Sequence, residues 1–436
     1  MSTRLSSWWY DLQHSLWFLP AVMTGIAIAL ALGMVRLDEY LLLDRRTGSS
    51  WLFGGGAEGA RGVLSAIAGT MITVTGVVFS ITIVALQLAS AQFTPRVLRT
   101  FTGDRGNQVV LGAFIGTFTY ALLVLRSVRS ASQDGAIFAP SASVTLAIVL
   151  VLVSIGLLIY YIHHAASSIR ASVIINRAAR DTLGLIDELF PADAGRPAPP
   201  SPPLPLNPPG LVQASASGYL QRIDQDALFS LAEERSIVVR LEPLVGEFVL
   251  PGAALASVWP AEKVDEGLTR SIHGTVVLGS ERTLQADVEL GFRQLADIAI
   301  KSLSPGINDP TTATICIDRL GEALVRLAHK GKPEEVRTGK DGGARVILHG
   351  PPFTRLVEVA FAQIRHYGAG DVTVVGHLLT TLGRMAALVP SERREPLGHQ
   401  ARLVLQAGRD QIVIPGDLDR MEQAGAWAVD GVIGTV

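Results

Sequence analysis

Four long intervals in the N-terminal part of the chain contain no Asp, Glu, Lys or Arg. They comprise 24 residues after Asp11, 34 after Arg61, 20 after Arg105 and 35 after Asp134. A helix needs roughly 20 apolar residues to cross the hydrocarbon core of a bilayer, so each interval is long enough for one spanning helix. The sequence therefore predicts four transmembrane helices near 16–36, 64–89, 108–126 and 141–163, whose interiors contain no acidic or basic residues; Arg36 and Arg126 stand at the ends of two of them.

The composition of the whole chain agrees with a membrane protein. Charged residues make up only 17% of the 436 positions and the mean hydropathy is +0.36, whereas soluble domains contain roughly 25% charged residues. Lys and Arg (37) nearly balance Asp and Glu (39), so there is no broadly basic surface and we expect no nucleic-acid partner. The single cysteine, Cys316, excludes a disulfide framework, and its apolar surroundings predict a buried, inert thiol.

The spans divide the chain into three parts. Residues 1–164 form the predicted four-helix transmembrane domain, and 165–210 contain an amphipathic helix at 168–190 followed by a linker with nine prolines. The helix either continues the last span or stands apart from it. Residues 211–436 mix short alternating segments with helical ones, which predicts a soluble α+β domain.

Four spans place both termini on the same side of the membrane. Seven arginines lie near the ends of the spans on that side and six near the other ends, so the positive-inside rule does not decide the orientation. A long C-terminal domain without a secretory signal favours the cytoplasm for both termini.

Four sequence stretches together resemble a known family. They are GVVFSITIVALQLASAQFTPRVLRTF at 76–101, DRGNQVVLGAFIGTFTYALLVLRSVR at 104–129, SIGLLIYYIHHAASSI at 154–169 and LGFRQLADIAIKSLSPGINDPTTATICIDRL at 290–320. The chain is similar in these stretches to an uncharacterised bacterial family of predicted membrane proteins, domain-of-unknown-function family twenty-two fifty-four. The resemblance implies four spans in a bacterial inner membrane and a cytoplasmic C-terminal domain, but it implies no particular chemistry.

The second span carries a stripe of small and hydroxyl residues. Their spacing is mostly three, four or seven, which places them on one side of a helix. One interpretation is a pore lining, in which hydroxyls and exposed carbonyls replace part of an ion's hydration shell. The other is close helix packing through small residues. The stripe contains Ala66, Gly69, Thr70, Thr73, Gly76, Ser80, Gln87 and Thr94.

The predicted spans lack charged residues, so no proton relay or coupling carboxylate is evident and a secondary active transporter is not favoured. Four helices enclose little water alone, so a pore requires a homo-oligomer. The leading hypothesis is therefore an ion channel in the lipid bilayer, with cations weakly favoured because Gln87 can form a ring of amide oxygens. Thr70, Thr73, Gly76 and Ser80 complete the predicted lining. Arg96 and Arg99 at the inner mouth could equally attract anions. The alternative is a membrane-tethered sensor or scaffold that transports nothing.

The most distinctive stretch of the C-terminal domain is Ser-Pro-Gly-Ile-Asn-Asp-Pro-Thr at 304–311. Its prolines and glycine force a break before a new helix, whose free N–H groups can bind an anion. Gly306, Asn308 and Asp309 are the predicted ligand-binding residues, since Asn308 and Asp309 can also offer oxygens to a cation. The alternative is a structural turn in which Asp309 caps its own helix and Pro310 occupies the first turn.

Motifs for other chemistry are missing from the sequence. There is no Walker A pattern, no H-E-x-x-H, no C-x-x-C and no G-x-S-x-G, so we do not expect an enzyme. The segment GEFVLPGAALASV resembles the hairpin of lipoyl- and biotinyl-type domains but lacks the carrier lysine, so no cofactor is expected. His349, His366 and His377 are too scattered for a metal site. His163 and His164, at the end of the last span, suit either a pH sensor or an interfacial cap.

Overall fold

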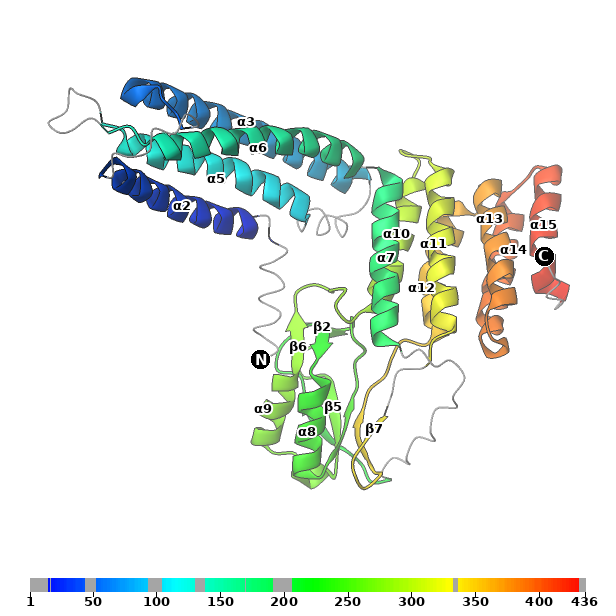
Figure 1. Cartoon of the computed structure of the whole chain (residues 1–436). Helices are drawn as coiled ribbons and strands as arrows, with labels where there is room; N and C mark the ends of the chain where they lie inside the picture. Colours follow the sequence, from blue (N-terminus) through cyan, green and yellow to red (C-terminus); the bar gives the residue numbers. More distant parts are fainter. Residues whose placement is uncertain are drawn as a thin grey trace. The chain divides into compact units, whose positions relative to one another are not determined.

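The computed structural model describes residues 15, 17–43, 52–92, 104–129, 138–168, 170–190, 206–331 and 336–430. The chain divides into two compact units, Leu5–Arg170 and Ala171–Val436. The described part of the first unit is built from helices, and the second contains helices and two β-sheets (Figure 1). The predicted fold class, four membrane-spanning helices followed by an α+β domain, is confirmed.

Four helices of the first unit are long and apolar enough to cross a membrane. They are α2 (Phe18–Leu43), α3 (Gly56–Gln92), α5 (Arg105–Ser127) and α6 (Ser141–Ser168). The expectation that no span contains a charged residue is wrong at the span ends, because the first span reaches Tyr40 and includes Asp38, and the second begins before Arg61. Charge-free intervals mark the hydrocarbon core, whereas the helices continue into the interfacial region on either side.

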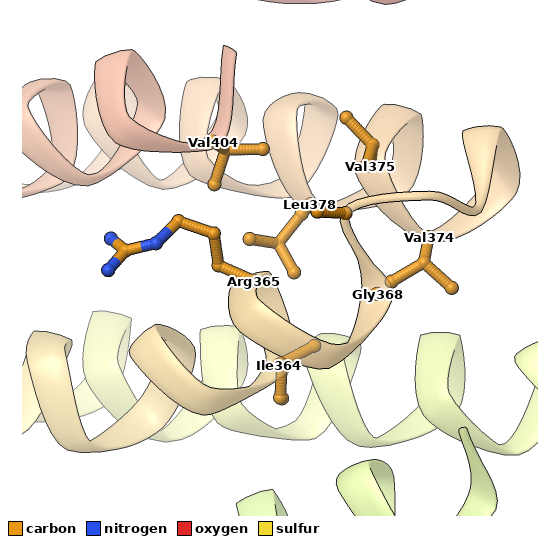
Figure 2. Close-up of a pocket in the computed structure, with 8 residues that line it drawn as sticks. Ile364, Arg365, Gly368, Val374, Val375, Leu378 and Val404 are labelled. Atoms are coloured by element: carbon orange, nitrogen blue, oxygen red, sulfur yellow. The ribbon is translucent and has the colours of Figure 1, made fainter. Parts of the chain in front are cut away.

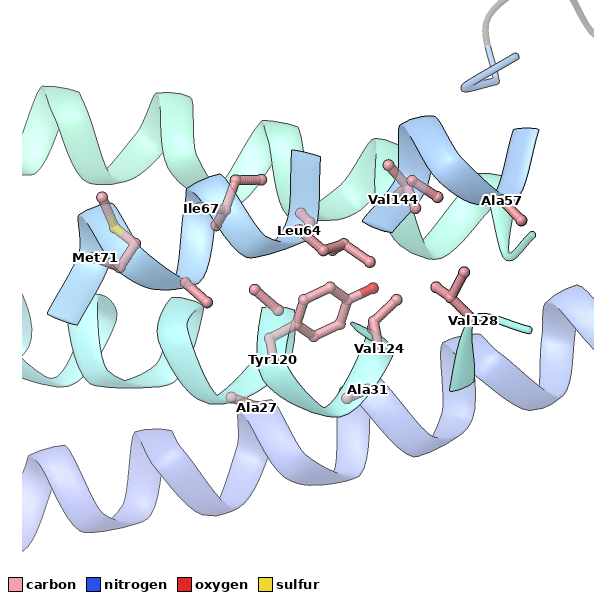
Figure 3. Packing of buried hydrophobic residues seen from close by; sticks show 14 residues of the cluster. Ala27, Ala31, Ala57, Leu64, Ile67, Met71, Tyr120, Val124, Val128 and Val144 are labelled. Atoms are coloured by element: carbon pink, nitrogen blue, oxygen red, sulfur yellow. The ribbon is translucent and has the colours of Figure 1, made fainter. Parts of the chain in front are cut away.

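Helix α5 is the centre of the first unit. Half of its span is buried, against less than a quarter for each of the other three, and it packs on α2, α3 and α6. Small residues permit the close approach of α2: a Cβ on Gly112 would lie 2.6 Å from Sδ of Met23 and 3.1 Å from Cα of Pro20. Tyr120 and Val124 of α5 lie amid buried residues of the other three helices (Figure 3).

A buried carboxylate joins α2 to the beginning of α6. Asp38 accepts hydrogen bonds from the backbone N–H of Ala142 (2.9 Å) and of Ser143 (2.8 Å), and from the Ser143 hydroxyl. The Tyr120 hydroxyl donates to the Ser143 carbonyl oxygen at 3.1 Å. A side chain of one helix thus caps another helix 104 positions later in the sequence, satisfying donors that have no partner within their own helix.

The beginning of α5 and the end of α6 meet in a second polar cluster. Asp104 caps α5 by accepting from the backbone N–H of Gly106 at 2.8 Å. Its Oδ1 also lies 3.1 Å from Nε2 of His164, whose ring stacks on Tyr160 with centroids 5.4 Å apart. His164 therefore has a specific acidic partner within the protein, and either interpretation of this histidine remains a prediction.

The second unit begins with an amphipathic helix, α7 (Ala171–Leu189). It starts after α6 has ended at Ser168, so it does not continue the last span. It packs on two later helices, α10 (Val288–Ser302) and α11 (Pro310–Ala328). Asp187 of α7 forms ion pairs with Arg326 and Lys330, and these hydrogen bonds lower the pKa of its carboxyl to about 2. Residues 191–205 of the predicted linker lie outside the described residues.

Two small sheets follow the linker region. The five-stranded sheet has the order β1-β5-β3-β8-β7, in which only the β3–β8 pair is parallel, and the three-stranded sheet has the order β4-β2-β6. Residues of α8 (Gln225–Arg235) and α9 (Glu266–Thr275) join the hydrophobic core of the larger sheet. The strands are β1 (Gly210–Gln213), β2 (Gly218–Ile223), β3 (Val238–Leu241), β4 (Phe248–Val249), β5 (Ala254–Trp259), β6 (Val276–Gly279), β7 (Val336–Thr338) and β8 (Ala344–Ile347).

The remaining helices form a layered bundle with α7, α10 and α11 (Figure 1). They are α12 (Phe353–Gly368), α13 (Val372–Leu388), α14 (Arg394–Gln411) and α15 (Pro415–Asp430). The turn residues at 368–371 and the loop at 412–414 separate neighbouring antiparallel helices.

A network of charged side chains connects the smaller sheet to this helical bundle. Arg282 donates to Asp287 (2.7 Å) and to Glu289 (3.3 Å), both almost fully buried. Arg355 of α12 joins Glu289 at 2.6 Å and Glu247 at 3.2 Å. The facing charges raise the pKa of Arg282 even though burial opposes its charged form. Three separate segments of the second unit are therefore held together by one cluster.

Cys316 is fully buried in α11, as the sequence predicts, and burial raises the pKa of its thiol. We expect a maleimide to label the native full-length protein more slowly than the denatured protein by orders of magnitude, because the thiolate is the reactive form. Ser271→Cys in a Cys316→Ala background is the control, since Ser271 is exposed. Equal labelling rates for Cys316 and the Ser271 control in native protein would show that α11 opens readily.

Candidate functional site

Helix α3 has one face that packs against its own unit. The helix contacts α5 and α6, and five residues on this face are buried in one hydrophobic cluster with residues of those helices (Figure 3). They are Ala57, Ala60, Leu64, Ile67 and Met71. Further along, Val78 is buried and the Thr82 hydroxyl lies 2.7 Å from the Tyr161 hydroxyl of α6. We call this face the seam.

The polar stripe predicted from the sequence lies on the opposite face of α3. A helix turns about 100° per residue, so two positions nine apart differ by about 180°. Six of the buried residues on the packed side have a stripe residue nine positions later, and these six stripe residues are exposed. The pairs are Ala57 with Ala66, Ala60 with Gly69, Leu64 with Thr73, Ile67 with Gly76, Met71 with Ser80, and Val78 with Gln87. Ala68 and Thr75 are buried as well, and they have the exposed apolar residues Val77 and Val84 at the opposite positions.

Among the residues that the structure describes, no other helix of the chain packs against the centre of the stripe. A Cβ built on Gly69 or Gly76 would meet nothing within 4 Å. Thr70 is also exposed, on the edge of this face, while Thr94 lies outside the described residues. Large exposed apolar side chains border the stripe, among them Ile72, Val77 and Phe79.

The two central hydroxyls bond to their own helix. Thr73 Oγ1 donates to the Gly69 carbonyl oxygen and Ser80 Oγ donates to the Gly76 carbonyl oxygen, each at 2.9 Å. A hydroxyl whose proton is used in this way still has oxygen lone pairs that can accept from water or contact a cation. The stripe thus offers small residues and oxygen atoms on an exposed face of a span.

The turn at 304–311 is a well-capped connection between α10 and α11. Asp309 caps α11: its Oδ1 accepts from the Thr312 N–H at 3.0 Å and its Oδ2 from the Thr312 hydroxyl at 2.6 Å. Asn308 adopts a left-handed conformation with φ of 50°, and Gly306 is exposed. Both carboxylate oxygens of Asp309 are engaged by its own helix, and ligand binding by these three residues stays a prediction.

A small apolar pocket lies elsewhere in the bundle, between α12, α13 and α14 (Figure 2). Arg365 supplies its one charged side chain and donates to Gln400 Oε1 at 3.0 Å. None of the predicted site residues lines it. The lining residues are Ile364, Arg365, Gly368, Ala369, Val374, Val375, Leu378 and Val404.

Metal-binding clusters are not found in the part of the chain that the structure describes, where no three His, Cys, Asp or Glu side chains converge suitably. His377 pairs with Asp318 at 2.7 Å instead. The sequence did not indicate the role of Asp38 or the contacts of Arg355 with Glu289 and Glu247, because the partners in each pair lie at least 66 positions apart along the chain. A carboxylate just beyond a charge-free interval was the only available signal for Asp38.

The model of a family described as "Predicted membrane protein (DUF2254)" matches residues 13–384. The chain belongs to this family. Uncharacterised proteins of Mycobacterium bovis and of two strains of Mycobacterium tuberculosis are each 36% identical to it, over 97% of this chain and 81% of theirs. No solved structure matches the chain significantly. DUF2254 membership confirms the resemblance seen in the four sequence stretches and a membrane location.

Proposed function

We propose that this DUF2254 protein is a homo-oligomeric, non-enzymatic ion channel of the bacterial inner membrane, lined by the stripe of α3. The observation that supports the proposal is the placement of the stripe opposite the seam. Within one chain, small and polar residues of a span are left without helix neighbours, and burying them requires another copy of the chain or a water-filled path. A ring of several copies provides neighbouring helices for the stripe and encloses a water-filled path at its centre.

Cations are the favoured cargo. Thr73 and Ser80 use their protons inside the helix, so their lone pairs would face the path, and the amide of Gln87 can offer an oxygen at one end. Oxygen lone pairs replace part of the hydration shell of a cation. We further propose that both termini are cytoplasmic, with the second unit acting as the regulatory domain.

The decisive experiment compares two glycine-to-leucine variants in reconstituted liposomes. Gly76 in α3 and Gly156 in α6 are both exposed glycines of spans, and a Cβ on either would meet nothing within 4 Å. We expect Gly76→Leu and Ser80→Leu to abolish Na⁺ or K⁺ flux, because every subunit of the ring adds one leucine side chain that narrows the ion path. Gly156→Leu should leave flux close to wild type. Native mass spectrometry checks that each variant still assembles.

Two results would contradict the channel. One is wild-type protein that conducts neither Na⁺, K⁺ nor Cl⁻ at any tested voltage, pH or osmotic gradient. The other is Gly76→Leu with unchanged flux, which would place the stripe against lipid.

The second candidate is a tethered sensor or scaffold whose α3 helices pack tightly against each other. The observation in its favour is that the hydroxyls of Thr73 and Ser80 already donate to the carbonyl oxygens of Gly69 and Gly76. The stripe can therefore be buried between helices without water. This candidate predicts an oligomer without flux, in which Gly76→Leu disturbs assembly because overpacking typically costs about 1–3 kcal/mol.

A further inference from the structure

Among the large side chains that are exposed on the helical bundle of the second unit, four lie in or next to three different connections between helices. Ile307 belongs to the α10–α11 turn, Tyr367 to the end of α12, and Val413 and Ile414 to the α14–α15 loop. Val413 is 91% exposed, Ile414 61% and Tyr367 59%. We call these four residues the apolar end patch.

Contacts between the three connections place them at the same end of the bundle. A Cβ on Gly368, beside Tyr367, would lie 3.3 Å from Cδ1 of Leu303, which directly precedes the α10–α11 turn. A Cβ on Gly370 would lie 3.2 Å from Oε1 of Gln411, two residues before Val413. The close approach of α12 and α13 at this end is visible around Gly368 and Val374 (Figure 2).

The first residue of α7 lies at this end as well. Thr182 of α7 packs against Gly291 of α10, where an added Cβ would lie 2.5 Å from Oγ1 of Thr182. Asp187 pairs with Arg326 and Lys330 at the end of α11, so α7 runs antiparallel to α10. Eleven residues back from Thr182 is Ala171, and eleven residues forward from Gly291 is Ser302, so the two helix ends are level.

Chain connectivity ties this end to the bilayer. The span of α6 ends at Ser167, α6 itself at Ser168, and α7 begins at Ala171. Three Cα-to-Cα steps cover at most about 11 Å, whatever the conformation between them. The headgroup and interfacial layers add roughly 10–15 Å to a bilayer in total, so the connection is too short to carry the first turn of α7 well clear of the layer in which α6 ends.

We propose that the apolar end patch inserts into the interfacial layer of the membrane that holds α6. Tyrosine and branched aliphatic side chains are typical of residues that enter this layer. The short connection between α6 and α7 limits how far this end of the bundle can move from the membrane. The effective concentration of the patch at the lipid surface is therefore high, and a small apolar contact suffices. The proposal depends on the membrane location of the chain and not on the channel.

The opposite end of the bundle provides an internal comparison. Leu388, at the end of α13, is 60% exposed, almost the same as Ile414. It lies 17 residues along α13 from Asp371, so about 25 Å of helix separates it from the patch end. The two positions therefore differ in their distance from α7's first residue rather than in their local exposure.

The test is a nitroxide spin label on full-length protein in lipid nanodiscs, carried by Ile414→Cys or by Leu388→Cys with Cys316 replaced by Ala. We expect the label at 414 to collide more often with oxygen, which concentrates in lipid, than with a water-soluble nickel chelate. The label at 388 should show the reverse preference. Adding Tyr367→Ser and Val413→Ser should move the 414 label toward the behaviour of the 388 label.

Two outcomes would overturn the proposal. Equal nickel accessibility at 414 and 388 would place the apolar end patch in water. Protection of 414 from both reagents, together with spin–spin broadening between labels, would show that a second copy of the chain covers the patch instead of lipid.

Discussion

Replacing Gly246 by alanine is expected to lower the free energy of unfolding of the second unit by about 3–5 kcal/mol, as when a buried ion pair loses a partner. The added Cβ would lie 2.3 Å from Oδ2 of Asp287 and 2.8 Å from Nη2 of Arg282. The substitution therefore displaces the network that joins the smaller sheet to α10 and α12. Thermal unfolding of the full-length protein, followed by tryptophan fluorescence, measures the effect.

Gly252→Ala is the matched control for this prediction. Gly252 has φ of 82° and Gly246 has φ of 91°, so both alanines carry left-handed strain of roughly 1–2 kcal/mol. A Cβ on Gly252 would meet nothing within 4 Å, so only the strain remains. Equal losses at the two glycines would mean that the network contributes nothing beyond backbone conformation.

The sequence predicted this region's helices but not its network. Asp287 is the N-cap of α10 and Glu289 stands in its first turn, where acidic residues suit the helix dipole in any protein. Arg355 lies 66 positions beyond Glu289, and Glu247 lies 108 positions before Arg355. No local periodicity reports such distant pairs. The helix cap at Asp309, by contrast, involves positions three apart, and it was one of the two interpretations of this turn that the sequence offered.

The orientation of the α3 stripe shows the same limit in the first unit. Spacing of three and four residues put Thr73, Gly76 and Ser80 on one face. Whether that face meets α5 or points away depends on tertiary packing, and the structure shows that Leu64, Ile67 and Met71 occupy the packed side. Strand β8 is a similar case, because it pairs with β3, whose residues lie about a hundred positions earlier in the chain.

Removing the carboxylate of Asp38 is the second large effect that we expect. Asp38→Ala leaves the N–H groups of Ala142 and Ser143 without their acceptor at a buried position, and each such donor costs about 1–3 kcal/mol. We expect a total loss of about 2–4 kcal/mol, measured by unfolding in mixed micelles with increasing denaturing detergent. Asp38→Asn keeps one acceptor oxygen and should fall between Asp38→Ala and wild type.

Glu39→Ala serves as its neighbouring control. Glu39 is largely exposed and its distance to Arg36 is 4.0 Å, an arrangement that contributes at most about 1 kcal/mol. Similar unfolding midpoints for Asp38→Ala and Glu39→Ala would show that water or lipid headgroups satisfy the start of α6.

The two faces of α3 separate the folding of a subunit from its association with others. The seam is complete within one chain, so a subunit can reach its tertiary structure before it meets a neighbour, and a substitution on the stripe leaves the seam intact. In a cell that makes both forms, wild-type and Ser80→Leu chains would enter the same ring at random. Under the proposed function, one Ser80→Leu subunit would then block ion flux through a ring whose other subunits are wild type, and the variant would behave as a dominant inhibitor.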